Sequence, residues 1–182
     1  AVQGIMGRFV PCLPVHINEF GENGIWFDQQ RFCKPFINDD LIYGLFGEEL
    51  AGLVKSEFLL PNDTGGYDLQ DGYRTQKQVE KHFEEQEPTD TTERLKLGLY
   101  DIISNVIFFY VLYSQGQHFH FRISMEKTNT FQNLIPHLQE KLRNLYVNYF
   151  YRRQDDFWKK EAMHKLPHLK AATNMLVCGE DL

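Results

Sequence analysis

The sequence contains little cysteine. Its 182 residues include three, Cys12, Cys33 and Cys178. An odd number at scattered spacing fits neither a disulfide framework nor a zinc site, whose ligands are closely spaced. We therefore expect free thiols in a reducing compartment and a cytoplasmic location. Because Cys178 has no histidine partner nearby in the sequence, we expect it to be a buried, unreactive thiol.

Positive charge and long apolar runs are also scarce. The chain has 19 Lys and Arg against 25 Asp and Glu, a formal net charge of −6. Binding to a nucleic-acid backbone requires clustered cations, so this balance argues against a DNA or RNA partner.

The longest apolar run, residues 106–113, is far shorter than the about 20 residues that a membrane helix needs. The opening Ala1 to Gly7 lacks an initiator Met and a signal-peptide pattern, which indicates an internal start.

Apolar and aromatic residues, by contrast, are abundant at 42% and 14% of the chain, which is enough to build a sizeable core. Their spacing indicates a mostly α-helical α+β fold. We expect helices over residues 39–46, 48–55, 75–86, 95–106 and 130–165. Thr75 and Gln78 match a capping box, and Gly47 separates the first two helices. The last helix should end before Pro167, with Phe157, Trp158 and Met163 continuing its buried stripe.

A β-hairpin is expected near the middle of the chain. Residues 106–113 are β-branched and aromatic, and residues 118–123 alternate after a four-residue turn. In the second strand, Phe119 and Phe121 should face the core, while His118 and His120 share the other face. Two such histidines could hold a metal ion, but no third ligand has suitable spacing. A solvated or aromatic-packed edge strand is the favoured interpretation, and we expect no metal site.

The chain ends on Asn-Met-Leu-Val-Cys-Gly-Glu-Asp-Leu, residues 174–182. Residues 175–178 have the apolar character of a strand, which delivers Glu180 and Asp181 at its C-terminal end. In barrels and open α/β sheets, catalytic groups lie where strands end. A solvated acidic terminus is the commoner explanation of such a pair, so its interpretation depends on the surrounding sequence.

That surrounding sequence resembles the 4-α-glucanotransferases, or amylomaltases, of glycoside hydrolase family 77. The resemblance is carried by Tyr-Arg-Arg-Gln-Asp-Asp-Phe-Trp-Lys-Lys-Glu-Ala at 151–162, by Leu166-Pro167 and by residues 175–182, and it extends to residues 1–14 and to Gly24-Ile25-Trp26. It is strongest to the long disproportionating subtype, in which an insertion separates the nucleophile strand from the acid/base strand. The resemblance implies three parts: a connector from the catalytic barrel (1–38), a mainly helical insertion subdomain (39–173) and a barrel strand (174–182).

The resemblance also implies a chemistry. The parent would be a (β/α)8 TIM barrel that transfers α-1,4-glucan segments or glucosyl units between maltooligosaccharides and glucans by a retaining double displacement, without a cofactor. Glu180 matches the family's general acid/base, which protonates the leaving glycosidic oxygen and then deprotonates the incoming hydroxyl. Asp181 would either orient the strand end or contact substrate.

Two carboxylates of that family are missing from this sequence. The motifs of the nucleophilic Asp and of the Asp that stabilises the transition state are absent, and Asp101, Asp155 and Asp156 lie in helical patterns. A retaining mechanism requires two carboxyl groups about 5 Å apart. We therefore expect this chain by itself to be inactive.

A second interpretation makes the helical part a non-catalytic interaction or glycan-binding module. Flat aromatic faces suit the C–H groups of pyranose rings, and the candidates are Trp26, Trp158, Tyr146, Tyr149 and Tyr151. Helical spacing favours a core role for them. The basic pairs at 152–153 and 159–160 are most simply the solvent face of the long helix. The two interpretations are compatible.

Overall fold

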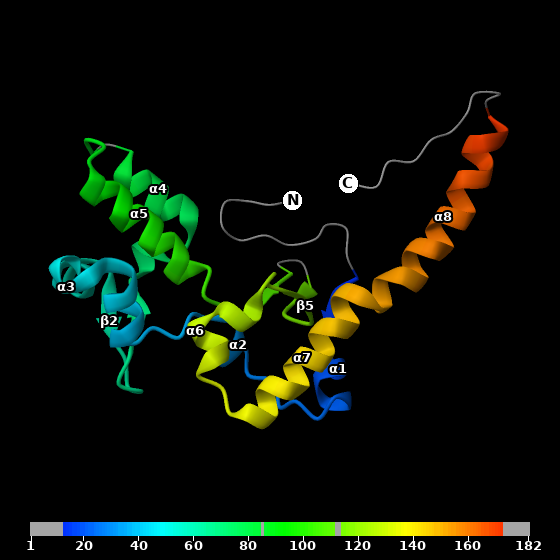
Figure 1. Cartoon of the computed structure of the whole chain (residues 1–182), viewed down its shortest axis with the longest axis horizontal. Coiled ribbons are helices and arrows are strands. Elements are labelled where there is room, and N and C mark those ends of the chain that lie inside the picture. Colours follow the sequence, from blue (N-terminus) through cyan, green and yellow to red (C-terminus); the bar gives the residue numbers. More distant parts are fainter. Residues whose placement is uncertain (1–12, 85, 112–113, 173–182) are drawn as a thin grey trace.

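The computed structural model describes residues 13–84, 86–111 and 114–172. These ranges are mostly helical, with one three-stranded and one two-stranded antiparallel sheet. The predicted α+β class with a predominance of helix is confirmed at this level. Figure 1 shows two lobes joined at a narrow waist and one long helix that extends away from both. No helix in the described ranges is long and apolar enough to cross a membrane.

The first lobe is built around the three-stranded sheet, in the order β1-β5-β4. Its elements are β1 (Val15–His16), α1 (Ile17–Glu22), α2 (Gln29–Cys33), β4 (Phe108–Tyr110), β5 (His118–Phe121), the 3-10 turn Met125–Lys127, α6 (Asn129–Gln132) and α7 (Pro136–Tyr151). The predicted hairpin is confirmed, because Phe108 of β4 pairs with Phe121 of β5. β1 lies within the segment expected to be a connector, and its Val15 pairs with Phe119.

Because β1 pairs with the other side of β5, that strand is central and the expectation of an edge strand is wrong. Phe119, His120 and Phe121 are all buried. The Phe119 ring lies 4.4 Å from the Phe27 ring between centroids, and the Phe121 ring lies 5.4 Å from that of Tyr149 on α7. Aromatic packing of this kind stabilises a core beyond the apolar area it buries. The first lobe therefore encloses β5 on both faces.

The second lobe consists of α3 (Asp39–Glu57), β2 (Leu59–Pro61), β3 (Tyr67–Leu69), the 3-10 turn Asp71–Tyr73, α4 (Gln76–Phe83) and α5 (Asp90–Ile103). The capping box predicted at Thr75 and Gln78 is present at the start of α4. Gly47 interrupts α3 with φ 71°, as expected of a residue separating two helical stretches. The ring of Phe46 packs onto Gly98 of α5, where a Cβ atom would lie 2.3 Å from Cε1 of the ring.

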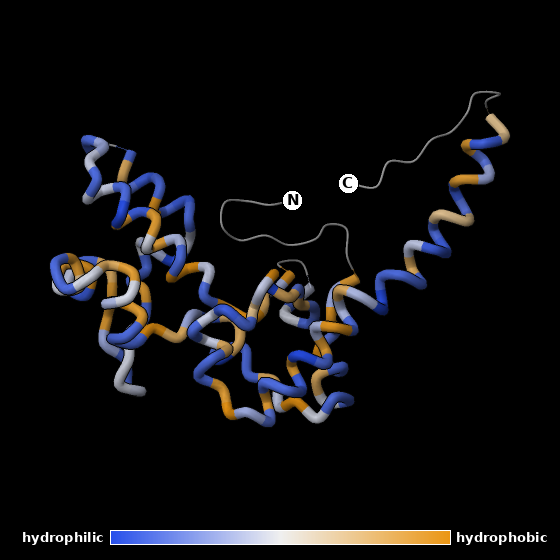
Figure 2. The backbone as a smooth tube through the Cα atoms, viewed as in Figure 1, coloured by the Kyte–Doolittle hydropathy of each residue, from blue (hydrophilic) through white to orange (hydrophobic). Residues whose placement is uncertain are grey.

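The last helix, α8 (Arg153–Ala171), follows α7 after a break at Arg152, whose φ is −130°. Two expectations are wrong here: Pro167 lies inside the helix, and Trp158 and Met163 are 44% and 66% exposed. Gln154 is the one buried residue of α8 among those described. Figure 2 shows apolar positions along α8 with no neighbouring element over most of its length. The apolar spacing of a buried helix is therefore present without a packing partner.

Candidate functional site

The two residues expected to carry the chemistry, Glu180 and Asp181, lie outside the described residues. So do Cys12 and Cys178. The three carboxylates set aside as nucleophile candidates are on helices: Asp101 on α5, and Asp155 and Asp156 in the first turn of α8. The described residues therefore do not include the expected reaction centre.

The two histidines of β5 take part in packing. Nδ1 of the buried His120 lies 2.7 Å from the hydroxyl oxygen of Tyr149, within hydrogen-bonding distance. The ring of His118 lies edge-on to that of His16, with 5.0 Å between centroids. The part of the chain that the structure describes contains no cluster of three His, Cys, Asp or Glu side chains suited to a metal ion.

The aromatic candidates for sugar stacking divide into buried and exposed residues. Tyr149 is fully buried and confirms the expected core role, whereas Tyr151 is 67% exposed and contradicts it. Trp26 is 90% exposed, although its neighbour Ile25 is buried and Phe27 stacks on Phe20 at 4.3 Å. The loop is fixed by Lys141, whose Nζ donates to the main-chain oxygen of Gly24 at 2.5 Å. Trp26 is therefore an outward-facing ring on a well-anchored loop.

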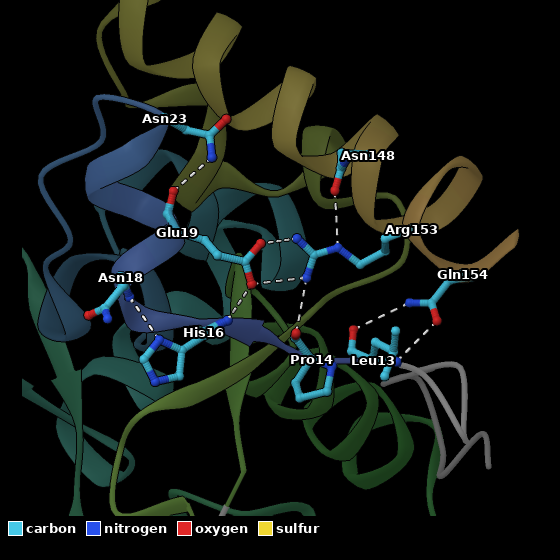
Figure 3. Close-up of polar contacts among 9 residues, drawn as sticks. All are labelled: Leu13, Pro14, His16, Asn18, Glu19, Asn23, Asn148, Arg153 and Gln154. Atoms are coloured by element: carbon cyan, nitrogen blue, oxygen red, sulfur yellow. Dashed lines mark hydrogen bonds and ion pairs between the residues drawn. The ribbon is translucent and has the colours of Figure 1, made fainter. Parts of the chain in front are cut away.

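A polar junction fastens the first described residues to the start of α8 (Figure 3). The Arg153 guanidinium forms a two-pronged ion pair with the Glu19 carboxylate, and its Nη1 also donates to the main-chain oxygen of Pro14 at 3.0 Å. Its Nε donates to Oδ1 of Asn148 at 3.0 Å. Both side chains are largely buried, with Arg153 15% and Glu19 27% exposed. A planar guanidinium matches a carboxylate in this way and fixes its orientation.

Gln154 completes the junction from the next position of α8. Its Oε1 accepts from the main-chain N–H of Leu13 at 3.0 Å, and its Nε2 donates to the main-chain oxygen of the same residue at 3.3 Å. Figure 3 shows the amide facing the backbone of Leu13. The chain therefore enters the first lobe at the same place where α8 leaves it. The sequence motif at 151–162 contains these residues, but their partners lie about 140 positions away.

The waist between the lobes consists of residues 34–36 and 104–106, and α6 holds both segments. The hydroxyl of Thr130 donates to the main-chain oxygen of Asn105 at 2.5 Å and accepts from the main-chain N–H of Phe36 at 2.8 Å. Nδ2 of Asn129 donates to the main-chain oxygen of Phe36 at 2.9 Å. Buried polar groups that are all satisfied in this way make a connection rigid. We therefore expect the lobes to keep a fixed relative position.

On one side of this waist lies an open cleft of about 390 Å³ between α3, α5 and α6. Two carboxylates and two cations line it, Asp40 and Asp101 against Arg122 and Lys127. Burial lowers the pKa of the Arg122 guanidinium, and the nearby Asp101 charge acts in the opposite direction. Burial also raises the pKa of Asp101, which the Arg122 charge opposes. These residues come from separate elements, so no spacing in the sequence indicates the cleft.

No family model and no solved structure matches the chain. It is 27% identical over 186 aligned residues to the 4-alpha-glucanotransferase DPE2 of Oryza sativa subsp. japonica, and the match covers 100% of this chain and 19% of that protein. The chain thus spans about a fifth of the relative's length. The resemblance inferred from the motifs at its two ends is confirmed: the chain is similar along its whole length to part of a 4-α-glucanotransferase.

Proposed function

We propose that this chain is a segment of a 4-α-glucanotransferase, whose complete form transfers α-1,4-glucan segments or glucosyl units between maltooligosaccharides and glucans. The observation that carries the proposal is the 27% identity to the rice enzyme over the entire chain. Sequence identity spread over the whole length, rather than limited to one motif, is what common descent of the segment would produce. The single free thiol of the described residues, Cys33, is compatible with a cytoplasmic location.

In this proposal, residues 174–182 form a strand of the parent's (β/α)8 barrel and present Glu180 to the substrate. Glu180 donates a proton to the glycosidic oxygen of the departing sugar, while an Asp supplied by another part of the parent forms the glycosyl ester. Glu180 then removes the proton from the acceptor hydroxyl as that oxygen attacks the anomeric carbon and displaces the Asp carboxylate, which restores the α configuration. Asp181 orients the strand end or contacts the sugar.

The helical part, residues 39–173, is in this proposal a subdomain inserted into the barrel, and residues 1–38 connect the two. The junction at Arg153 supports an insertion, because it places Pro14 and Glu19 of the connector beside the start of α8, so the chain leaves the first lobe close to where it enters it. Residues 15–33 also contribute β1, α1 and α2 to the first lobe, so the connector is part of the subdomain's core. Because a retaining reaction needs a second carboxylate, we propose that the segment alone does not catalyse transfer.

The test uses the complete protein that contains this chain, with Glu180→Gln. We expect its disproportionation of maltotriose to fall by about 10²- to 10⁴-fold, the usual contribution of a general acid/base. With α-maltosyl fluoride as donor and azide as acceptor, the variant should regain turnover, because fluoride leaves without protonation and azide attacks without a base. Glu161→Gln on α8 is the matched control, since that side chain forms only a surface pair with Lys165.

Full turnover of maltotriose by the Glu180→Gln variant would refute the acid/base assignment. Loss of turnover without any recovery by azide would also count against it, because a structural role predicts no such rescue. Inactivity of the unaltered complete protein on every maltooligosaccharide tested would refute the proposed function as a whole.

A second candidate function is a non-catalytic interaction or glycan-binding module. The exposure of Trp26 on an anchored loop favours it, since a ring that is 90% exposed adds little to the core and leaves its face open to a sugar. In the complete protein, Trp26→Ala should then weaken binding to glycogen while the turnover of maltotriose stays unchanged. Unchanged glycogen binding would show that Trp26 does not contribute to glycan binding.

A further inference from the structure

We propose that the cleft between α3, α5 and α6 binds a neutral oligosaccharide, namely a stretch of α-glucan chain. The proposal rests on the proposed function for the identity of the sugar. The balance of two carboxylates and two cations in the lining leaves little net charge to select an anion or a cation. A ligand with many hydroxyl groups, each both donor and acceptor, is the chemistry that such a mixed lining matches.

Arg122 is held in place before any ligand arrives. Its Nε donates to the main-chain oxygen of Ser104 at 2.6 Å, and its Nη1 donates to that of Ile123 at 2.9 Å. Its Nη2 donates no hydrogen bond to any of the described residues. The guanidinium therefore keeps donor capacity for a ligand while its orientation is already fixed, which lowers the entropic cost of binding.

Asp101 supplies an acceptor on the same cleft. Its carboxylate makes neither a hydrogen bond nor an ion pair in the described ranges, even though Arg122 lines the same cleft. A donor and an acceptor that face one cleft without joining each other can bind neighbouring hydroxyls of one sugar ring. Gln132, an exposed amide of α6 that also lines the cleft, can donate and accept at once.

The size and walls of the cleft also suit a sugar chain. Its volume of about 390 Å³ falls in the range of about 300 to 1,000 Å³ that small-molecule sites occupy. Leu41 and Leu45 of α3 are only partly buried and give one wall an apolar surface, on which the C–H groups of a pyranose can rest. Because Thr130 and Asn129 lock the waist beside it, the cleft is preformed.

A second open cleft, of about 400 Å³, lies between α2 and the β2–β3 turn and is the natural comparison. It has three carboxylates, including Asp68, against the two cations Arg31 and Lys34. Arg31 is already engaged: it lies 4.5 Å over the ring of Phe36, and its Nη2 donates to the main-chain oxygen of Asn133 at 2.9 Å. With three carboxylates against two cations, this cleft is not charge-balanced, and it serves as the control.

The test is hydrogen exchange, followed by mass spectrometry, on the complete protein carrying Glu180→Gln, with maltoheptaose as the probe. We expect the sugar to slow exchange in peptides covering residues 99–105 and 127–132. The double variant Asp101→Ala/Gln132→Ala should need about tenfold more maltoheptaose to reach the same protection. A loss of this size is expected when hydrogen bonds to a charged group are removed. Both residues lie at exposed positions, although the Asp101 carboxylate is partly desolvated, so the variant should fold. Asp68→Ala is the matched control and should change nothing.

Three outcomes would overturn the inference: no protection at the two peptides, protection unchanged in the double variant, or protection by inorganic phosphate but not by maltoheptaose. The proposed function is tested separately, by the disproportionation of maltotriose by the unaltered protein. Protection of the cleft in a protein that proves inactive would support the glycan site and refute the enzyme. Turnover of maltotriose without protection of the cleft would support the enzyme and refute the glycan site.

Discussion

The hydroxyl of Thr130 donates to the main-chain oxygen of Asn105 over 2.5 Å, deep in the waist between the two lobes. Oδ1 of the same asparagine accepts from the main-chain N–H of Thr130 at 2.9 Å, so the two residues are joined from both sides. Since the Thr130 hydroxyl also accepts from Phe36, one side chain connects both segments that cross the waist. The short helix α6 therefore holds the two segments of the waist together.

Thr130→Val should destabilise the chain. Valine has nearly the same shape, but it leaves the oxygen of Asn105 and the N–H of Phe36 without their partner. Each orphaned buried group costs about 1–3 kcal/mol, so we expect the free energy of unfolding to fall by at least about 2 kcal/mol. Urea denaturation followed by circular dichroism measures the change. Thr91→Val, at an exposed position of α5, is the control and should stay within about 0.5 kcal/mol.

Arg153→Met should loosen the junction at the start of α8. The substitution removes the partner of Glu19 and the donors to Pro14 and Asn148, and both members of the pair are largely buried. Leaving such a carboxylate unpaired should cost about 1–3 kcal/mol of unfolding free energy. Arg152→Met, one residue earlier and exposed, should have little effect. Equal stability of the two variants would show that the ion pair does not hold the junction.

Gly98→Ala and Gly52→Ala should have opposite effects on stability. At Gly98 the new methyl group would lie 2.3 Å from the buried ring of Phe46, so α3 and α5 must move apart. Overpacking of this kind costs about 1–3 kcal/mol and outweighs the about 1 kcal/mol gained in helix propensity. At Gly52, also helical, nothing lies within 4 Å, so alanine should raise the melting temperature. A stabilised Gly98→Ala variant would contradict the close packing.

Cys33 should resist alkylation in the native chain. Burial, with a smaller contribution from the charge of Asp28, raises the pKa of its thiol to about 12. The thiolate is the reactive form, so at pH 8 iodoacetamide should modify Cys33 about 10³-fold more slowly than an ordinary thiol of pKa about 8.5. The rate should still rise about tenfold per pH unit between pH 8 and 10. Peptide mass spectrometry separates Cys33 from Cys12 and Cys178, and native labelling as fast as in urea would disprove the burial.

Local signals in the sequence predicted local structure well. The capping box at Thr75 and the aromatic hairpin around 114–117 each depend on residues a few positions apart, and both are present. β1 was beyond such signals because two residues, Val15 and His16, are too few to show a period, and their pairing depends on β5 about 100 positions later. The spacing along α8 predicts an apolar stripe correctly but carries no information on whether a partner covers it.

The functional residues follow the same division. Glu180 was inferred from a contiguous motif, and its role stays a prediction because it lies outside the described residues. The cleft between the lobes could not be predicted in this way, since Leu41, Asp101 and Gln132 meet only because the waist brings three helices together. A site whose residues come from distant elements produces no local motif or regular spacing in a single sequence.

The bonds between Leu13 and Gln154 bring two positions 141 residues apart into contact. When the two ends of a stretch lie together, the gap that it must bridge in a host chain is as short as that of a tight turn, whatever the size of the stretch. Such a unit can be transplanted into an exposed loop, or removed and replaced by a few residues, while the surrounding strands keep their register. The two bonds of the Gln154 amide thus give the body between residues 13 and 154, without most of α8, the adjoining ends that a transferable part needs.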